Sequence, residues 1–305
     1  MRRYDKLTDK EMDYTELTAQ KAKSLLPQRP LQSNKGTFGK VLNIAGCIEY
    51  QGAAWLSSVT PLKTGAGLVT LATIENVINN LASNCPWITF YPLRDYYKKC
   101  IASDAFGDVN NIIDKYTVIS VGCGLSTSPP ISAFIDDLIK YLNMSGKKAV
   151  IDADAINVIA ESEITKLPSN SVITPHPMEL SRLIKVPLAE IQSDRIKYAR
   201  LTAEKFGCCV VLKGNKTVIC TKEFEVFVNT SGNSALAKAG SGDVLTGMIS
   251  GFIAQGLSVK DASCLGVYLH GLCGELAAKD LTQYSVLATD QIDYIPTAIK
   301  FLLGS

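Results

Sequence analysis

Short apolar runs alternate with longer amphipathic segments through most of this chain. Each run, rich in Val, Ile, Leu and Ala, is followed by a segment whose apolar residues recur every three or four positions, the spacing of a helix. This order of strand and crossover helix predicts parallel strands with right-handed connections. We therefore expect an α/β fold with a doubly wound, largely parallel central sheet and helices on both faces. The expected strands are residues 41–46, 68–73, 116–121, 148–152 and 171–174, and the expected helices are 52–64, 131–142 and 193–206.

The start of the chain lies outside this alternation. Residues 1–33 are polar, and we expect them to form an N-terminal arm with a short helix near 14–26 that Pro27 ends. Residues 34–305 are expected to form one domain. Within it, the apolar stretches 208–213 and 217–220 flank Gly214-Asn215-Lys216, which predicts a strand, a tight turn and a second strand.

Small and polar residues follow three of the expected strands at the point where each strand ends. Gly122 and Gly124 follow the first, Asp152 and Asp154 the second, and His176 the third. Because ligands bind at the carboxyl edge of open parallel sheets, we expect these residues to share one site. Simpler roles stay open: the glycines can form a tight turn, and a helix cap is favoured for Asp154, although both aspartates would face one side of an extended backbone.

Two roles are also possible for each of the histidines and for one lysine. His176 lies between two prolines that restrict the backbone around it, which favours a ligand contact over a core imidazole. His270 lies in an amphipathic helix, where a packing role is favoured. Lys213 ends an expected strand and could be a solvated hairpin lysine or part of a ligand site. The segment Gly36-x-x-Gly39-Lys40 lacks the spacing of a P-loop, so it is either a glycine-rich lip over a ligand or an ordinary turn.

Residues 229–251 carry the clearest chemical signal. Gly240, Ser241, Gly242 and Asp243 form a small-residue turn just before an apolar helix. The unpaired N–H groups of such a helix start attract an anion, especially a phosphoryl group in transfer. A carboxylate at this point repels a bound phosphate, so its placement fits a base that takes a proton from an attacking hydroxyl. The alternative is that Asp243 only caps the helix.

Composition narrows the setting of this chemistry. With 47% hydrophobic residues and a net charge of +2, the chain can bury a large core and shows no basic surface for nucleic acid. It has no apolar signal-peptide core and no run long enough to span a membrane. Its nine cysteines are scattered without a C-x-x-C pair, which is typical of reduced thiols in the cytoplasm.

Taken together, these stretches resemble the ribokinase-like superfamily and, within it, the NAD(P)H-hydrate dehydratases, which repair nicotinamide nucleotides. The resemblance runs from about Pro27 to near the C-terminus and covers several motifs in the family's order. They are KGTFGKVLNIAG with GAA, GCGL, IDADAIN, TPHPMELSRL, VLKGNKTVI, NTSGNSALAKAGSGDVLTGMI, YLHG and LATD.

The resemblance implies a lyase that acts on hydrated NADH or NADPH (the S-epimer). The ring hydroxyl is phosphorylated from ADP with Mg²⁺, giving AMP, and loss of phosphate then restores the dihydronicotinamide. The Thr174-Pro-His-Pro177 form favours ADP over ATP as donor. The resemblance further implies a homo-oligomer and a possible separate NAD(P)H-hydrate epimerase as partner, and it assigns no magnesium ligands.

Motif matches also assign roles. By the resemblance, Asp243 is expected to be the base and to contact the substrate. The remaining assignments are an anion hole (Ala239, Gly240, Ser241, Gly242), nucleotide contacts (Lys213, Gly214, Asn215, Lys216, Thr217, Gly242) and further substrate contacts (Ala53, Gly124, His176). The chain departs from the family at Cys123, where proline is usual, at Met178, where glycine is usual, and at Ser241, where threonine is common.

Two alternatives remain after the resemblance. Another ribokinase-like enzyme, a kinase for a vitamin precursor such as hydroxyethylthiazole or hydroxymethylpyrimidine, shares the Gly-x-Gly-Asp turn. The VLKGNKTVI and TPHP-x-E segments favour the dehydratase over it. A catalytically silent nucleotide-binding sensor would be expected to lack Asp243, which is present.

Overall fold

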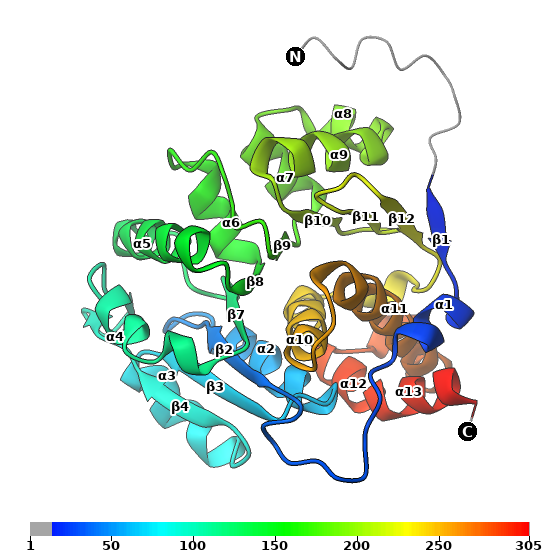
Figure 1. Ribbon diagram of the computed structural model, residues 1–305, viewed down its shortest axis with the longest axis horizontal. Coiled ribbons are helices and arrows are strands. Elements are labelled where there is room, and N and C mark those ends of the chain that lie inside the picture. Colours follow the sequence, from blue (N-terminus) through cyan, green and yellow to red (C-terminus); the bar gives the residue numbers. More distant parts are fainter. Residues whose placement is uncertain (1–13, 305) are drawn as a thin grey trace.

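The computed structural model describes residues 14–304, and within them one large sheet organises the chain (Figure 1). Its strands lie in the order β1-β12-β11-β10-β9-β8-β7-β2-β3-β4, and all neighbours are parallel except those of β11. The doubly wound, largely parallel sheet is thus confirmed. In sheet order the strands are β1 (Thr15–Leu17), β12 (Val226–Asn229), β11 (Val218–Cys220), β10 (Cys209–Leu212), β9 (Ser171–Ile173), β8 (Lys148–Ile151), β7 (Val118–Val121), β2 (Lys40–Ile44), β3 (Leu68–Thr73) and β4 (Thr89–Pro92).

Helices cover both faces of this sheet, which explains why the residues of its central strands are almost all buried. On one face, α2 (Gln51–Lys63), α10 (Ser241–Ala254) and α11 (Val259–Ser285) pack on the strands. The other face carries α5 (Pro129–Ser145), α6 (Ala153–Ala160), α7 (Pro177–Ile184) and α9 (Arg195–Phe206) (Figure 1). The remaining elements are α1 (Ala19–Leu25), α3 (Glu75–Leu81), α4 (Phe106–Asn110), α8 (Leu188–Ser193), α12 (Ala288–Asp293), α13 (Ile295–Leu303), three 3₁₀ turns and a small hairpin of β5 (Asp95–Tyr96) and β6 (Cys100–Ile101).

The strand order reverses between β2 and β7. From β2 the chain builds outward through β3 to β4, and it then returns to β7 on the other side of β2 before building outward to β10. At the carboxyl ends of this pair, the Gly46 N–H donates to the Cys123 carbonyl over 3.0 Å. Such a reversal opens a crevice outside the strand ends, where ligands of this architecture bind.

The expected helix at 14–26 is wrong in its first part. Thr15–Leu17 is a strand, β1, which pairs in parallel with β12, and Thr18 caps the shorter helix α1 by accepting from the Lys21 N–H. Leu17 is buried in the core, so a residue of the predicted arm packs against the predicted domain. None of the helices in residues 14–304 is long and apolar enough to cross a membrane.

The glycine-rich segment before β2 is a turn. Gly39 has a φ of +69°, and a Cβ there would lie 1.9 Å from the carbonyl oxygen of Ala254, at the C-terminal end of α10. This contact places the segment at the amino ends of the parallel strands, away from their carboxyl edge. Of the two alternatives for this segment, the glycine-rich lip over a ligand is therefore wrong and the ordinary turn is confirmed.

Candidate active site

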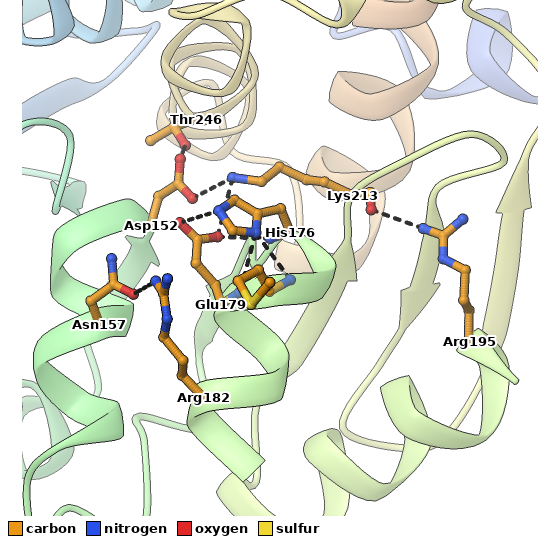
Figure 2. A network of polar contacts seen from close by, with 9 residues as sticks. Asp152, Asn157, His176, Glu179, Arg182, Arg195, Lys213 and Thr246 are labelled. Atoms are coloured by element: carbon orange, nitrogen blue, oxygen red, sulfur yellow. Dashed lines mark hydrogen bonds and ion pairs between the residues drawn. The ribbon is translucent and has the colours of Figure 1, made fainter. Parts of the chain in front are cut away.

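The carboxyl edge of the sheet brings together acidic and basic side chains from distant parts of the chain (Figure 2). The Lys213 ammonium, at the end of β10, lies 2.8 Å from Asp152 Oδ1 at the end of β8. It also lies 3.8 Å from Glu179 Oε2 in the first turn of α7. The second Asp152 oxygen accepts from the Thr246 hydroxyl of α10 over 2.7 Å. These contacts link β8, β10, α7 and α10 around one point.

Lys213 is therefore not a solvated hairpin lysine, because only 18% of its side chain is exposed. Burial alone would lower its pKa, but the Asp152 and Glu179 carboxylates raise that pKa above its ordinary value. The pKa of Asp152 would likewise rise on burial, and the Lys213 ammonium holds it below its usual range. The pair is thus charged on both sides at neutral pH.

The N-terminus of α10 points its free amides into this edge. Gly240 has a φ of +88°, and the first helical hydrogen bond runs from the Val244 N–H to the Gly240 carbonyl. Within residues 14–304, the amides of Gly242 and Asp243 have no carbonyl acceptor. The Ser241 amide differs, because it donates to the Lys238 carbonyl. The turn therefore presents the two amides that an anion needs, together with the helix dipole.

The Asp243 carboxyl lies partly buried beside these amides. Burial first, and then the negative charge of Asp152, raise the pKa of Asp243 to about 7. The positive charge of Lys213 is also close, since a Cβ added to Gly242 would lie 3.3 Å from its Nζ. A carboxyl with this pKa can accept a proton at neutral pH, which a capping aspartate at a surface turn would not be tuned to do.

The two alternating aspartates do not share one side of the backbone. Asp152 occupies the N-cap position of α6 without a side-chain cap bond, while Asp154 lies inside the first turn. The Asp154 carboxylate accepts from the Ser126 N–H over 2.8 Å, so it tethers the loop after β7. The helix cap expected for Asp154 is therefore wrong, because Asp152 occupies the N-cap position and the Asp154 carboxylate binds an amide of a neighbouring loop.

His176 has a structural role besides any ligand contact. Its Nδ1 accepts from the N–H groups of Met178 and Glu179 over 3.2 and 3.1 Å, and the Glu179 carboxylate accepts from the His176 N–H over 2.7 Å. This is a capping box at the start of α7. Because Nδ1 is an acceptor, the neutral ring carries its proton on Nε2, on a side chain that is 47% exposed. Burial, and next the Lys213 charge, lower its pKa.

Two predicted substrate contacts, Ala53 and Gly124, meet at the strand reversal. A Cβ added to Gly124, which has a φ of +64°, would lie 3.0 Å from the Ala53 Cβ and 2.6 Å from the Tyr50 Cβ. Only glycine allows the loop after β7 to lie this close to the start of α2. Ala53 and Gly124 thus line one corner, although they are far apart in sequence.

The predicted nucleotide loop, residues 213–217, is shaped by an arginine that the sequence analysis missed. Arg195, the first residue of α9, donates through Nη2 to the carbonyls of Leu212 and Lys213 over 2.7 and 2.9 Å. Its Nη1 contacts the carbonyls of Asn215 and Lys216. One guanidinium thus holds four carbonyls in and beside this loop. An arginine that opens an amphipathic helix carries no sequence signal of such a role, whereas Glu179, three residues after His176, has the spacing of a capping box.

Known proteins that resemble this chain point to one family. A family model for NAD(P)H-hydrate dehydratase matches residues 41–297. The chain belongs to the NAD(P)H-hydrate dehydratase family. It is 34% identical to the ADP-dependent (S)-NAD(P)H-hydrate dehydratase of Bacillus subtilis, over 93% of this chain and 97% of the relative. It is 36% identical to a bifunctional NAD(P)H-hydrate repair enzyme of Moorella thermoacetica, of which it spans only 54%.

Solved structures agree with this assignment. The ADP/ATP-dependent NAD(P)H-hydrate dehydratase of Bacillus subtilis, co-crystallised with ATP and Mg²⁺, superposes with a TM-score of 0.84 at 31% identity, over 95% of this chain and 99% of that one. A hydroxyethylthiazole kinase of Pyrococcus horikoshii superposes with a TM-score of 0.61 at 13% identity. The second likeness is one of fold alone. The ribokinase-like architecture is confirmed by a structure from Enterococcus faecalis described as a ribokinase-like superfamily protein, with a TM-score of 0.83 at 29% identity.

Proposed function

We propose that this protein is an ADP-dependent NAD(P)H-hydrate dehydratase that restores NADH and NADPH from their hydrated S-forms. One observation carries the assignment to this site: a carboxyl with a pKa of about 7, Asp243, lies beside free amides of a helix start and close to a buried lysine. The single-function bacterial relatives, which match this chain over most of their length, carry the same activity in their names. Such a site can deprotonate a hydroxyl and stabilise the phosphoryl group that this hydroxyl attacks.

The reaction has two steps. Asp243 takes the proton of the hydroxyl on the hydrated ring, and the oxygen attacks the terminal phosphorus of ADP. A new P–O bond forms, the bond to AMP breaks, and the amides of Gly242 and Asp243 stabilise the charge on the moving phosphoryl oxygens. The ring nitrogen then expels the phosphate, a far better leaving group than hydroxide, and loss of a ring proton restores the double bond.

The proposed binding residues divide between two ligands. Lys213 to Thr217 and Gly242 contact the nucleotide, and Ala53, Gly124 and His176 contact the hydrated dinucleotide. Geometry supports part of this division, because residues 213–217 form the loop that Arg195 contacts and Ala53 meets Gly124 at the strand reversal. His176 lies after β9, beside Lys213, and its place with the dinucleotide rests on the motif match. Ala239 and Gly240 complete the anion hole with Gly242. Ser241 belongs to this hole by its position in the turn and not as a donor, because its amide already donates to the Lys238 carbonyl and its hydroxyl donates to Gln291.

Mg²⁺ fits the proposed site as a partner of the nucleotide. Within residues 14–304, no group of three or more His, Cys, Asp or Glu side chains could hold a metal ion by itself. Mg²⁺ commonly uses one or two carboxylates and completes its shell with phosphate and water. The carboxylates beside Lys213, those of Asp152 and Glu179, are buried and already face its ammonium, so the ion would be held mainly by the ADP phosphates and water. The ion would neutralise charge on the ADP phosphates during transfer.

The setting of the activity is part of the proposal. All nine cysteines are free and buried, which supports a reducing compartment, the cytoplasm. A homo-oligomer and a separate NAD(P)H-hydrate epimerase, which would supply the S-form, remain predictions that size measurement and a coupled assay can test.

An absorbance assay tests the function directly. Purified protein is given hydrated NADH and Mg²⁺ with ADP, with ATP or with no nucleotide, and NADH absorbance is followed. We expect a rise only when a nucleotide is present and a higher rate with ADP. A protein that binds nucleotide but produces no NADH would contradict the proposal and move the assignment to a vitamin-precursor kinase, tested with hydroxyethylthiazole and hydroxymethylpyrimidine.

A further inference from the structure

Three polar side chains from three helices meet beneath the phosphoryl site. The Ser241 hydroxyl of α10 lies 3.0 Å from His270 Nε2 of α11 and 3.1 Å from Gln291 Oε1 of α12. His270 Nε2 and Gln291 Oε1 are themselves 3.1 Å apart, so the three groups form a closed triangle. All three residues are buried, and α10, α11 and α12 pack against one another there (Figure 1).

Burying these three polar side chains costs free energy that apolar side chains would not cost. A buried polar group costs about 1–3 kcal/mol when it lacks a hydrogen-bond partner. The Gln291 amide nitrogen is buried and has no such partner among residues 14–304. On α10 and α11, residues close in sequence to Ser241 and His270, including Val244 and Leu269, are apolar and fully buried. Packing alone would thus favour apolar side chains at all three positions, and the packing role expected for His270 does not account for its polarity.

The position of the triangle suggests what it is for. Ser241 lies between Gly240 and Gly242, in the turn that presents the free amides, and neither glycine has a side chain to restrain it. The turn also packs on α12, because a Cβ on Gly240 would lie 2.9 Å from the Ala288 Cβ. Burial lowers the pKa of His270 to about 4, so the ring is neutral and offers hydrogen bonds without charge. A neutral anchor can fix the turn without competing with the ligand for the phosphoryl charge.

We propose that His270 and Gln291 are positioning residues for phosphoryl transfer. Through the Ser241 hydroxyl they hold the first turn of α10, so that the amides of Gly242 and Asp243 face the phosphoryl group and the Asp243 carboxylate faces the hydroxyl. The inference rests on the proposed function and extends it to two residues that do not touch the ligands.

The test uses the full-length protein with Ser241→Ala, His270→Leu and the double variant, and with Ser241→Thr as the conservative replacement. We expect Ser241→Ala and His270→Leu each to lower kcat by about 10- to 100-fold, with less than threefold change in the KM for hydrated NADH. Because both act through one hydroxyl, the double variant should be no worse than the poorer single variant, and Ser241→Thr should keep most activity. Cys273→Ala, which removes another buried side chain from α11, is the control for lost packing.

Two further measurements distinguish the possible outcomes. Thermal unfolding shows which variants are folded. A folded His270→Leu variant with wild-type kcat would overturn the proposal. So would a double variant in which the kcat losses of the two single variants multiply. Calorimetric titration with ADP and Mg²⁺ measures nucleotide binding without the dehydration reaction. We expect about three- to tenfold weaker ADP binding in Ser241→Ala, in His270→Leu and in the double variant. Unchanged ADP binding in these variants would also overturn the proposal. If the wild type fails to produce NADH, the proposed function fails while this titration still decides the role of the triangle.

Discussion

The titration of one carboxyl sets the pH range in which this site can work. As the proposed base, Asp243 must be ionised to accept the hydroxyl proton, and burial with the Asp152 charge raises its pKa to about 7. We therefore expect kcat/KM to fall about tenfold for each pH unit below 7 and to level off above it. Initial rates between about pH 5.5 and 8.5 at constant ionic strength measure this profile. A rate that stays constant from pH 5.5 to 7 would show that another group is the base.

The same carboxyl should make the folded protein less stable at neutral pH. Its folded-state pKa lies above the ordinary value of 3.8, so between about pH 4 and 7 the folded state binds more protons than the unfolded chain. The free energy of unfolding thus falls as pH rises through this window, by roughly 4 kcal/mol at most. Asp243→Asn removes this loss, and we expect a Tm several degrees higher than that of the wild type at pH 8 but an equal Tm at pH 4.

Thermal unfolding of both proteins at the two pH values measures this difference. The variant should bind nucleotide and lose most turnover, because an amide cannot take the proton. An equal Tm at pH 8 would mean that the ionised carboxylate is well solvated in the folded state. The expected pattern is the familiar conflict between stability and activity at a functional residue.

At the scale of elements, Arg195 holds the proposed nucleotide loop between β10 and β11 in shape. Its planar guanidinium contacts four carbonyls, those of residues 212, 213, 215 and 216. A lysine keeps the charge but lacks the fork, so Arg195→Lys should release part of this loop. We expect the KM for ADP to rise about tenfold, or about 1.4 kcal/mol, while the KM for hydrated NADH changes little. Steady-state kinetics with each ligand varied in turn measure both constants.

Lys197→Gln is the matched control, because it removes an exposed cation two residues along the same helix without touching the loop. It should leave both constants near their wild-type values. If Arg195→Lys weakened ADP and hydrated NADH equally, the arginine would support the whole carboxyl edge and not the nucleotide loop alone.

Local patterns predicted the elements, but not which side chains would pair. The apolar runs identified seven of the ten strands of the large sheet but not β1, β4 or β12, and the turn at 240–243 identified a helix start. Both signals depend on neighbours in sequence. The contacts of Asp152 join residues 61 and 94 positions away, Lys213 and Thr246. Those contacts depend on strand order, which no single run encodes. The same reason hid Arg195 and made Asp154 look like a cap: their partners lie on other elements.

At the scale of the whole molecule, the pairing of β1 at the edge of the sheet bears on where the folded domain begins. β1 pairs with β12 from Thr15↔Phe227 to Leu17↔Asn229, and the Thr230 hydroxyl donates to the Leu17 carbonyl over 2.5 Å. The Leu17 side chain is 1% exposed. If β1 is part of the domain, its loss should destabilise the whole protein. It should also disturb the segment after β12, which leads to the anion hole.

Leu17→Asp tests this view of the boundary. A carboxylate at a fully buried apolar position has no partner, and we expect a loss of about 3 kcal/mol or more in the free energy of unfolding. Leu31→Asp is the control within the same predicted arm, because Leu31 is fully exposed and its replacement should leave stability unchanged. Urea unfolding of the three proteins gives the comparison. If Leu17→Asp were as stable as the wild type, β1 would be dispensable and the domain would begin after the arm; the expected loss instead makes β1 its first strand.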